Sequence, residues 1–307
     1  MMPRMASTRG QALPRRAALA AFALGPALLL PGCGIRLEED APRVPLVPTR
    51  KPIGGEEALL TLLADSARLE TLAGSTEGAL AASLVALHGS QRTALERALT
   101  ARDVPLPRAS PTPTPSASGP VATLREGELA GYLGHAAYLP CAPDLRATVS
   151  SLLAQRYAAA LLLGAPVPAE APPPLSGAAV SRLVDRLREA VWRFEVIAAQ
   201  SSGSQRKLAM ATLAVLQQVR DEATMAGGAS SPPLGYVLPG PVTTASAARA
   251  LAGPTLSDLR AAFGDELIEL AETTGGSGLA TVPRWLGSIE AQAHRWGVPL
   301  VAFPGLG

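Results

Sequence analysis

The stretch VSRLVDRLREAVWRFEVIA, residues 180–198, decides the fold class of this chain. Its apolar residues recur at steps of three and four, which places them on one broad face of an α-helix. These residues are Val180, Leu183, Val184, Leu187, Val191, Phe194, Ile197 and Ala198. So wide an apolar face has to be buried against other elements, so the pattern predicts a core helix of an all-α fold.

Three further helices are predicted in the same half of the chain. Gly203 is the predicted hinge before a second helix, and a Gly-, Ser- and Pro-rich segment, residues 227–241, follows that helix as a crossing between two helical hairpins. The apolar residues of the second helix are Leu208, Ala211, Val215 and Val219; those of the third are Leu256, Leu259, Phe263, Leu267 and Leu270; those of the fourth are Leu279, Val282, Leu286, Ile289, Ala293 and Trp296. Residues 178–307 therefore predict a four-helix bundle.

The preceding half is also predicted to be helical. Helical periodicity extends over residues 56–163 and is interrupted by a Pro-rich insert, residues 105–120. Residues 164–177, GAPVPAEAPPPLSG, predict a linker to the C-terminal bundle. Two organisations fit this pattern: a duplicated four-helix unit, or a C-terminal bundle with an N-terminal helical companion packed against it.

The N-terminal residues predict export. Residues 1–32 combine four arginines, among them the pair Arg15 and Arg16, with an uncharged apolar run too short for a membrane span. The small residues before Cys33 resemble a bacterial lipobox, which implies that Cys33 is acylated and becomes the mature N-terminus. Residues 33–55 would then be a tether. We expect a protein anchored by lipid to the extracytoplasmic face of the cell membrane, exported by the general or the twin-arginine route.

The charge balance excludes one class of partner. The chain has 27 basic and 25 acidic residues, and residues 1–32 hold four of the basic residues and no acid. The mature chain is therefore mildly acidic and has no clustered basic stripe, so it lacks the electrostatic footprint of a nucleic-acid-binding protein. The expected partners are the membrane, through the N-terminal lipid, and an envelope protein or a small ligand.

Three segments carry a family resemblance: YVLPGPVT at residues 236–243, EAVWRFEVI at 189–197 and VAFPGL at 301–306. From about residue 178 to the end, the chain resembles a ferritin-like domain of unknown function found in actinobacterial exported proteins. The resemblance implies a four-helix bundle of ferritin-like topology and no established activity.

A ferritin-like bundle raises the question of a metal site. Di-iron sites of this kind use a Glu-x-x-His pair on each of two helices, and the residues three places before the three histidines are Val85, Tyr132 and Ala291. A weaker set remains, in which Glu195, Glu266, Glu290 and His294 lie on or beside apolar stripes. These carboxylates could hold iron or manganese, or they could pair with arginines. The expected arginine partners are Arg188, Arg193, Arg220 and Arg295. On the second helix, the stripe position that corresponds to these carboxylates is Gln218.

The other reactive side chains predict no chemistry. His88 and His135 are expected at the surface or its boundary, and Cys141 as an inert or partly exposed loop thiol. The three tryptophans, Trp192, Trp285 and Trp296, are expected to anchor the bundle. The leading hypothesis is a non-catalytic binding or structural role without a cofactor. The alternative is a metal-binding or redox protein.

Overall fold

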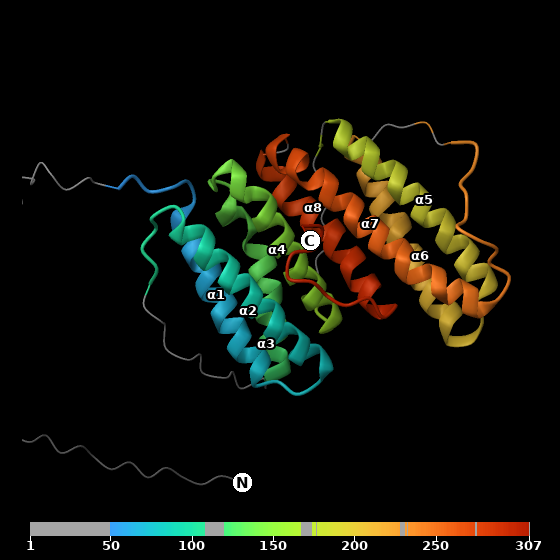
Figure 1. Ribbon diagram of the computed structural model, residues 1–307, viewed down its shortest axis with the longest axis horizontal. Coiled ribbons are helices and arrows are strands. Elements are labelled where there is room, and N and C mark those ends of the chain that lie inside the picture. The colour runs from blue at the N-terminus through green and yellow to red at the C-terminus, as the bar shows by residue number, and fades with distance from the viewer. Residues whose placement is uncertain are drawn as a thin grey trace, which may run out of the picture. The chain divides into compact units, whose positions relative to one another are not determined.

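The computed structural model confirms the all-α fold class (Figure 1). It describes residues 50–107, 120–166, 174, 175, 177–227, 231, 233–273 and 275–306. Over these ranges every regular element is helical. The predicted signal, with Arg15, Arg16 and Cys33, lies outside the described residues, as does most of the Pro-rich insert. None of the described helices is long and apolar enough to cross a membrane.

The N-terminal half forms helices where the apolar periodicity predicted them. Their bounds are α1 (Glu56–Gly74), α2 (Ala79–Thr100), α3 (Pro120–Leu133), the 3-10 helix η1 (Gly134–Tyr138) and α4 (Pro143–Leu162). Gly78 precedes α2 with φ 118°, a backbone conformation that favours glycine and ends the α1–α2 turn. Pro143 starts α4, where its missing N–H costs no intrahelical hydrogen bond.

The C-terminal half contains four longer helices. They are α5 (Ala178–Gln200), α6 (Gly203–Met225), α7 (Ala245–Thr273) and α8 (Gly275–Arg295). The predicted hinge at Gly203 is confirmed, because its φ of 55° is left-handed. The third helix is longer than predicted: α7 begins well before Leu256 and continues through the exposed Pro254.

One hydrophobic core is shared by α5, α6, α7 and α8. All the apolar residues predicted for the first, third and fourth of these helices are buried. On α6 the predicted face is partly confirmed, because Val219 is buried and Leu208 and Val215 are half-buried against the core. Ala211 was wrong, since it is exposed, and the buried face also carries Ala209, Thr212, Leu213 and Leu216.

The two halves are packed against each other within one compact unit, residues 51–307. Helix α4 lies against α8 (Figure 1), and their backbones approach so closely that a Cβ on Gly287 would lie 2.4 Å from the carbonyl oxygen of Ala154. The Tyr132 hydroxyl donates to the carbonyl of Ala280 over 3.0 Å. Leu279 of α8 belongs to a core formed mainly by α1, α2 and α4.

The C-terminal segment after α8 also bridges the halves. Gln91 of α2 donates to the carbonyl of Ala302 over 2.9 Å, and Ser151 of α4 donates to that of Pro304 over 2.7 Å. At Gly264 of α7 the segment comes close enough that a Cβ would lie 1.8 Å from the Gly305 carbonyl oxygen. Glycine is therefore required at position 264 for the segment to reach α7.

Candidate functional site

Two of the four residues predicted as metal ligands lie near the protein surface. Glu195 is exposed on α5, so its predicted inward position was wrong. Glu266 of α7 is only 13% exposed, but it accepts two hydrogen bonds from Arg182, from Nε and Nη2, each over 2.6 Å. Glu266 is thus committed to a bidentate pair that joins α7 to α5.

The other two residues lie on α8. Glu290 is fully buried and contacts Nη1 of Arg260 at 3.0 Å and the backbone N–H of Val301 at 3.0 Å. Burial raises the pKa of Glu290, and the Arg260 guanidinium opposes that shift only in part. His294 is half-buried one turn further on.

The structure does not bring the four predicted ligands together. Within the described ranges, no three His, Cys, Asp or Glu residues form a group able to hold a metal ion. The carboxylates that are paired use Arg182 and Arg260, neither of which was among the arginines expected. The alternative of arginine pairing therefore describes Glu266 and Glu290.

Sequence reasoning missed the buried carboxylate of α6. Gln218 is exposed, whereas Glu222 pairs with Nη1 of Arg284 at 2.8 Å and accepts from the indole N–H of Trp285 at 2.8 Å. The signal was available, because Glu222 lies three residues after the buried Val219. Trp285 is confirmed as a core anchor, and Trp296 likewise donates to a core hydroxyl.

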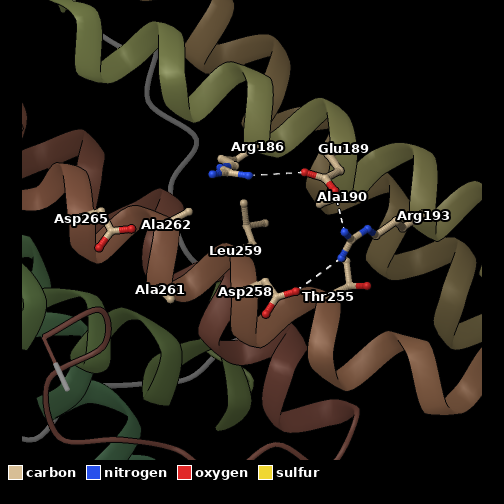
Figure 2. Close-up of a pocket in the computed structure, with 10 residues that line it drawn as sticks. All are labelled: Arg186, Glu189, Ala190, Arg193, Thr255, Asp258, Leu259, Ala261, Ala262 and Asp265. Carbon is tan, nitrogen blue, oxygen red and sulfur yellow. Dashed lines mark hydrogen bonds and ion pairs between the residues drawn. The ribbon is translucent and has the colours of Figure 1, made fainter. Parts of the chain in front are cut away.

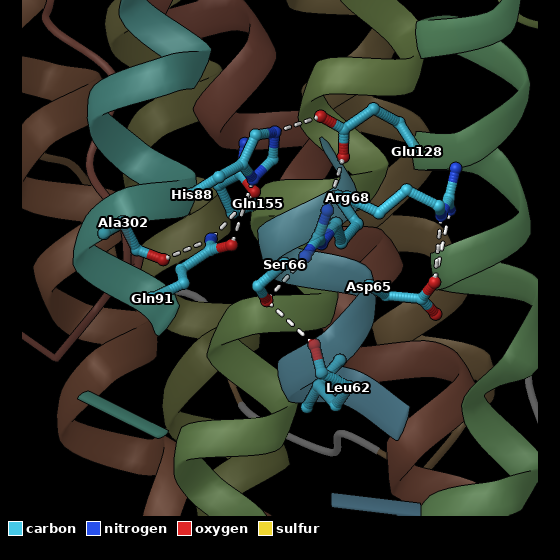
Figure 3. Close-up of polar contacts among 10 residues, drawn as sticks. Leu62, Asp65, Ser66, Arg68, His88, Gln91, Glu128, Gln155 and Ala302 are labelled. Atoms are coloured by element: carbon cyan, nitrogen blue, oxygen red, sulfur yellow. Dashed lines mark hydrogen bonds and ion pairs between the residues drawn. The ribbon is translucent and has the colours of Figure 1, made fainter. Parts of the chain in front are cut away.

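A buried polar network fills the centre of the N-terminal half (Figure 3). His88 was predicted at the surface or its boundary, which was wrong: its side chain is fully buried. Its Nε2 lies 2.7 Å from Oε1 of Glu128, and its Nδ1 lies 3.2 Å from Oε1 of Gln91. Arg156 of α4 also belongs to the network, and its Nη1 lies 3.5 Å from Oε2 of Glu128.

The network also fixes its own hydrogen-bond directions. Gln91 Nε2 donates to Gln155 over 2.8 Å and to the Ala302 carbonyl over 2.9 Å, so its Oε1 faces His88 as an acceptor. Both ring nitrogens of His88 therefore face oxygen atoms, Nδ1 that of Gln91 and Nε2 that of Glu128. Burial lowers the pKa of Arg156, and Glu128 opposes that shift.

The remaining candidate side chains, Cys141 and His135, are buried and half-buried. Cys141 is buried rather than partly exposed, and burial raises the pKa of its thiol to about 11. Its Cα lies 2.8 Å from the position a Cβ on Gly55 would take, which encloses the thiol further. His135 is half-buried beside the ring of Tyr132, with 6.0 Å between ring centroids.

A charged groove lies between α5 and α7 (Figure 2). Its first hollow has a volume of about 250 Å³, and its lining includes the small side chains Ala190, Ala261 and Ala262. Arg193 crosses one end, with Nη2 at 2.5 Å from Glu189 and Nη1 at 3.4 Å from Asp258.

A second hollow of about 480 Å³ continues the groove toward the α6–α7 connection. The two hollows share Arg186, Glu189, Ala262 and Asp265, so together they form one continuous groove. The far end of the second hollow is lined by Tyr236. The Tyr236 ring packs against that of Trp192, with 5.7 Å between centroids.

The groove lies in the segment that resembles a known family. Residues 179–307 match the family described as a domain of unknown function, DUF4439. No curated protein matches the chain, and no solved structure does. The match covers all of α6, α7 and α8 and nearly all of α5, and it leaves α1 to α4 outside.

Proposed function

We propose that this chain is a lipid-anchored cell-envelope protein whose helical body binds a ligand or partner without catalysing a reaction. The observation that carries the proposal is the α5–α7 groove, in which Arg186 and Asp265 lie on facing helices with no contact between them within 4 Å (Figure 2). The groove offers charged groups of both signs to a ligand. It is lined by no group of metal ligands within the described residues.

We further propose that α5 to α8 form a ferritin-like four-helix bundle. Two hairpins, α5–α6 and α7–α8, joined by the long connection of residues 226–244, share one core, and α5 contacts α7 while α6 contacts α8. This is the pattern of a bundle with one long crossover. The hairpins α1–α2 and α3–α4, with α1 against α3, repeat the pattern in the N-terminal half and support a duplicated unit.

The arginine pairs support a binding role over metal or redox chemistry. A carboxylate that neutralises a guanidinium in a bidentate pair has its oxygen atoms occupied, as those of Glu266 are by Arg182. In the N-terminal half, the two oxygen atoms of the buried Glu128 contact His88 and Arg156, one each. Recruiting either carboxylate to a metal would leave a cation without its partner.

A measurement of bound metal tests the proposal that the protein has no catalytic metal. The mature chain, with Cys33 changed to Ser and purified without chelator from an exporting host, is expected to contain no stoichiometric iron, manganese or zinc by plasma mass spectrometry. One bound equivalent that disappears in Glu290→Gln would overturn this part of the proposal.

Cell fractionation tests the anchor. The wild-type chain is expected in the membrane fraction, because several acyl chains on one N-terminus hold a protein far more tightly than one chain does. Cys33→Ser is expected in the soluble fraction. Cys141→Ser is the matched control, because that buried thiol is not available for acylation. Membrane retention of Cys33→Ser would contradict the proposed anchor.

A further inference from the structure

We infer that the α5–α7 groove binds a small zwitterion, a free amino acid or short peptide that carries both an ammonium and a carboxylate group. The inference rests on the proposed binding function and names its ligand class. Two observations carry it: opposite charges on facing helices that do not pair with each other, and two connected hollows of the size of a small ligand.

The unpaired charges distinguish this place from the rest of the groove. Elsewhere, arginines of α5 and carboxylates of α7 are in contact, as Arg182 is with Glu266 at 2.6 Å. Asp265 has no ion-pair partner in the part of the chain that is described, and Arg186 has a single contact, 3.6 Å to Glu189 on its own helix. Figure 2 shows Arg186 and Asp265 on opposite sides of the hollow. If these charges served only to join α5 to α7, Arg186 and Asp265 would also be in contact.

The volume of the groove sets the size of the ligand. The two hollows, of about 250 and 480 Å³, suit an amino acid or a dipeptide.

The charge pattern excludes simpler ligands. Glu189 and Asp258 already contact Arg193, so Arg186 and Asp265 decide the charge of the ligand. A ligand with a single charge would leave either Arg186 or Asp265 without a counter-charge. A zwitterion satisfies both sets: its carboxylate meets Arg186, and its ammonium meets Asp265.

Titration with glycylglycine tests the inference, monitored by NMR shifts of the Trp192 indole and by calorimetry on the soluble Cys33→Ser chain. We expect a Kd of about 1 mM, a value typical of a few charge-assisted hydrogen bonds at a solvated site. N-acetylglycylglycine, which lacks the ammonium, and glycylglycinamide, which lacks the carboxylate, are each expected to bind about tenfold more weakly. Inorganic phosphate is expected not to bind.

Variants assign the two charges. Arg186→Gln is expected to weaken glycylglycine binding about tenfold while leaving glycylglycinamide binding unchanged. Asp265→Asn is expected to weaken glycylglycine binding by a similar factor while leaving N-acetylglycylglycine binding unchanged. Both side chains are exposed, so the fold is expected to persist, which circular dichroism checks. Arg206→Gln on the exposed face of α6 is the matched control.

Three results would overturn the inference: no binding of glycylglycine at about 50 mM, equal binding of the capped peptides, or equal affinity of both groove variants and the control. Any of these, obtained with a membrane-anchored and metal-free wild-type protein, would leave the proposed envelope role standing. Failure of the envelope role itself would appear separately, as retained metal or as loss of the Cys33-dependent anchor.

Discussion

Changing Glu128 to Gln should destabilise the protein strongly, because it leaves a buried guanidinium without its carboxylate. Arg156 and Glu128 are both fully buried, and their closest contact is 3.5 Å. With an effective dielectric constant of about 20, two unit charges at that distance attract by about 5 kcal/mol. The change keeps an oxygen facing His88 and nearly the same volume, so it removes the charge with little change in packing.

The expected loss in the free energy of unfolding is about 3 to 5 kcal/mol, the usual cost of breaking a buried ion pair from one side. Urea denaturation followed by circular dichroism measures it, and Tm should fall by about 10 °C. Glu70→Gln is the control: Glu70 pairs with Arg92 at 2.9 Å, but both side chains are about one-third exposed, and the change should cost less than about 1 kcal/mol. A Glu128→Gln variant as stable as the control would refute the argument that Glu128 neutralises Arg156.

Three further predictions concern packing and titration. Gly264→Ala should cost about 1 to 3 kcal/mol and expose the C-terminal segment to carboxypeptidase, because the added methyl group would lie 1.8 Å from the Gly305 carbonyl oxygen; unchanged protection would show that the segment is held elsewhere. Cys141 should react slowly with a thiol reagent at pH 8 until the protein unfolds, because burial raises its pKa to about 11; fast reaction in the native state would contradict that burial. The pKa of Glu290 is raised in the folded protein, so its contribution to stability is greatest below its ordinary pKa and is lost as pH rises through the folded value. Glu290→Gln should therefore flatten this part of the profile of stability against pH. An unchanged profile would show that other groups cause the pH dependence.

The apolar stripes were sufficient to predict most helices of the C-terminal half. On α5, α7 and α8 the stripe is wide and nearly continuous, and every apolar residue predicted to be buried is buried. On α6 the apolar residues are sparser and alanines lie on several faces, so periodicity could not fix the rotation of the helix and the inward Glu222 was missed.

The buried network was harder to predict because its members depend on partners from other helices. His88 and Gln91 lie at stripe positions between Leu84 and Leu95 of α2, so their burial could be inferred from spacing. What the spacing could not show is that Glu128 and Arg156 come from helices far along the chain. A polar residue at a stripe position indicates a core partner, but it does not identify that partner.

The packing of α4 changes how the family match is interpreted. Every residue of α4 from Val149 to Ala160 is buried, which requires neighbours on more than one side of the helix. One side meets the polar network through Arg156, and another meets α8, where the absence of a side chain on Gly287 lets the helices touch. Ala154 belongs to the same hydrophobic core as α5 to α8. The boundary of the matched segment, residue 179, therefore does not coincide with a boundary in packing. Helix α4 buries a face of α8, whereas the charged groove between α5 and α7 stays open to a ligand.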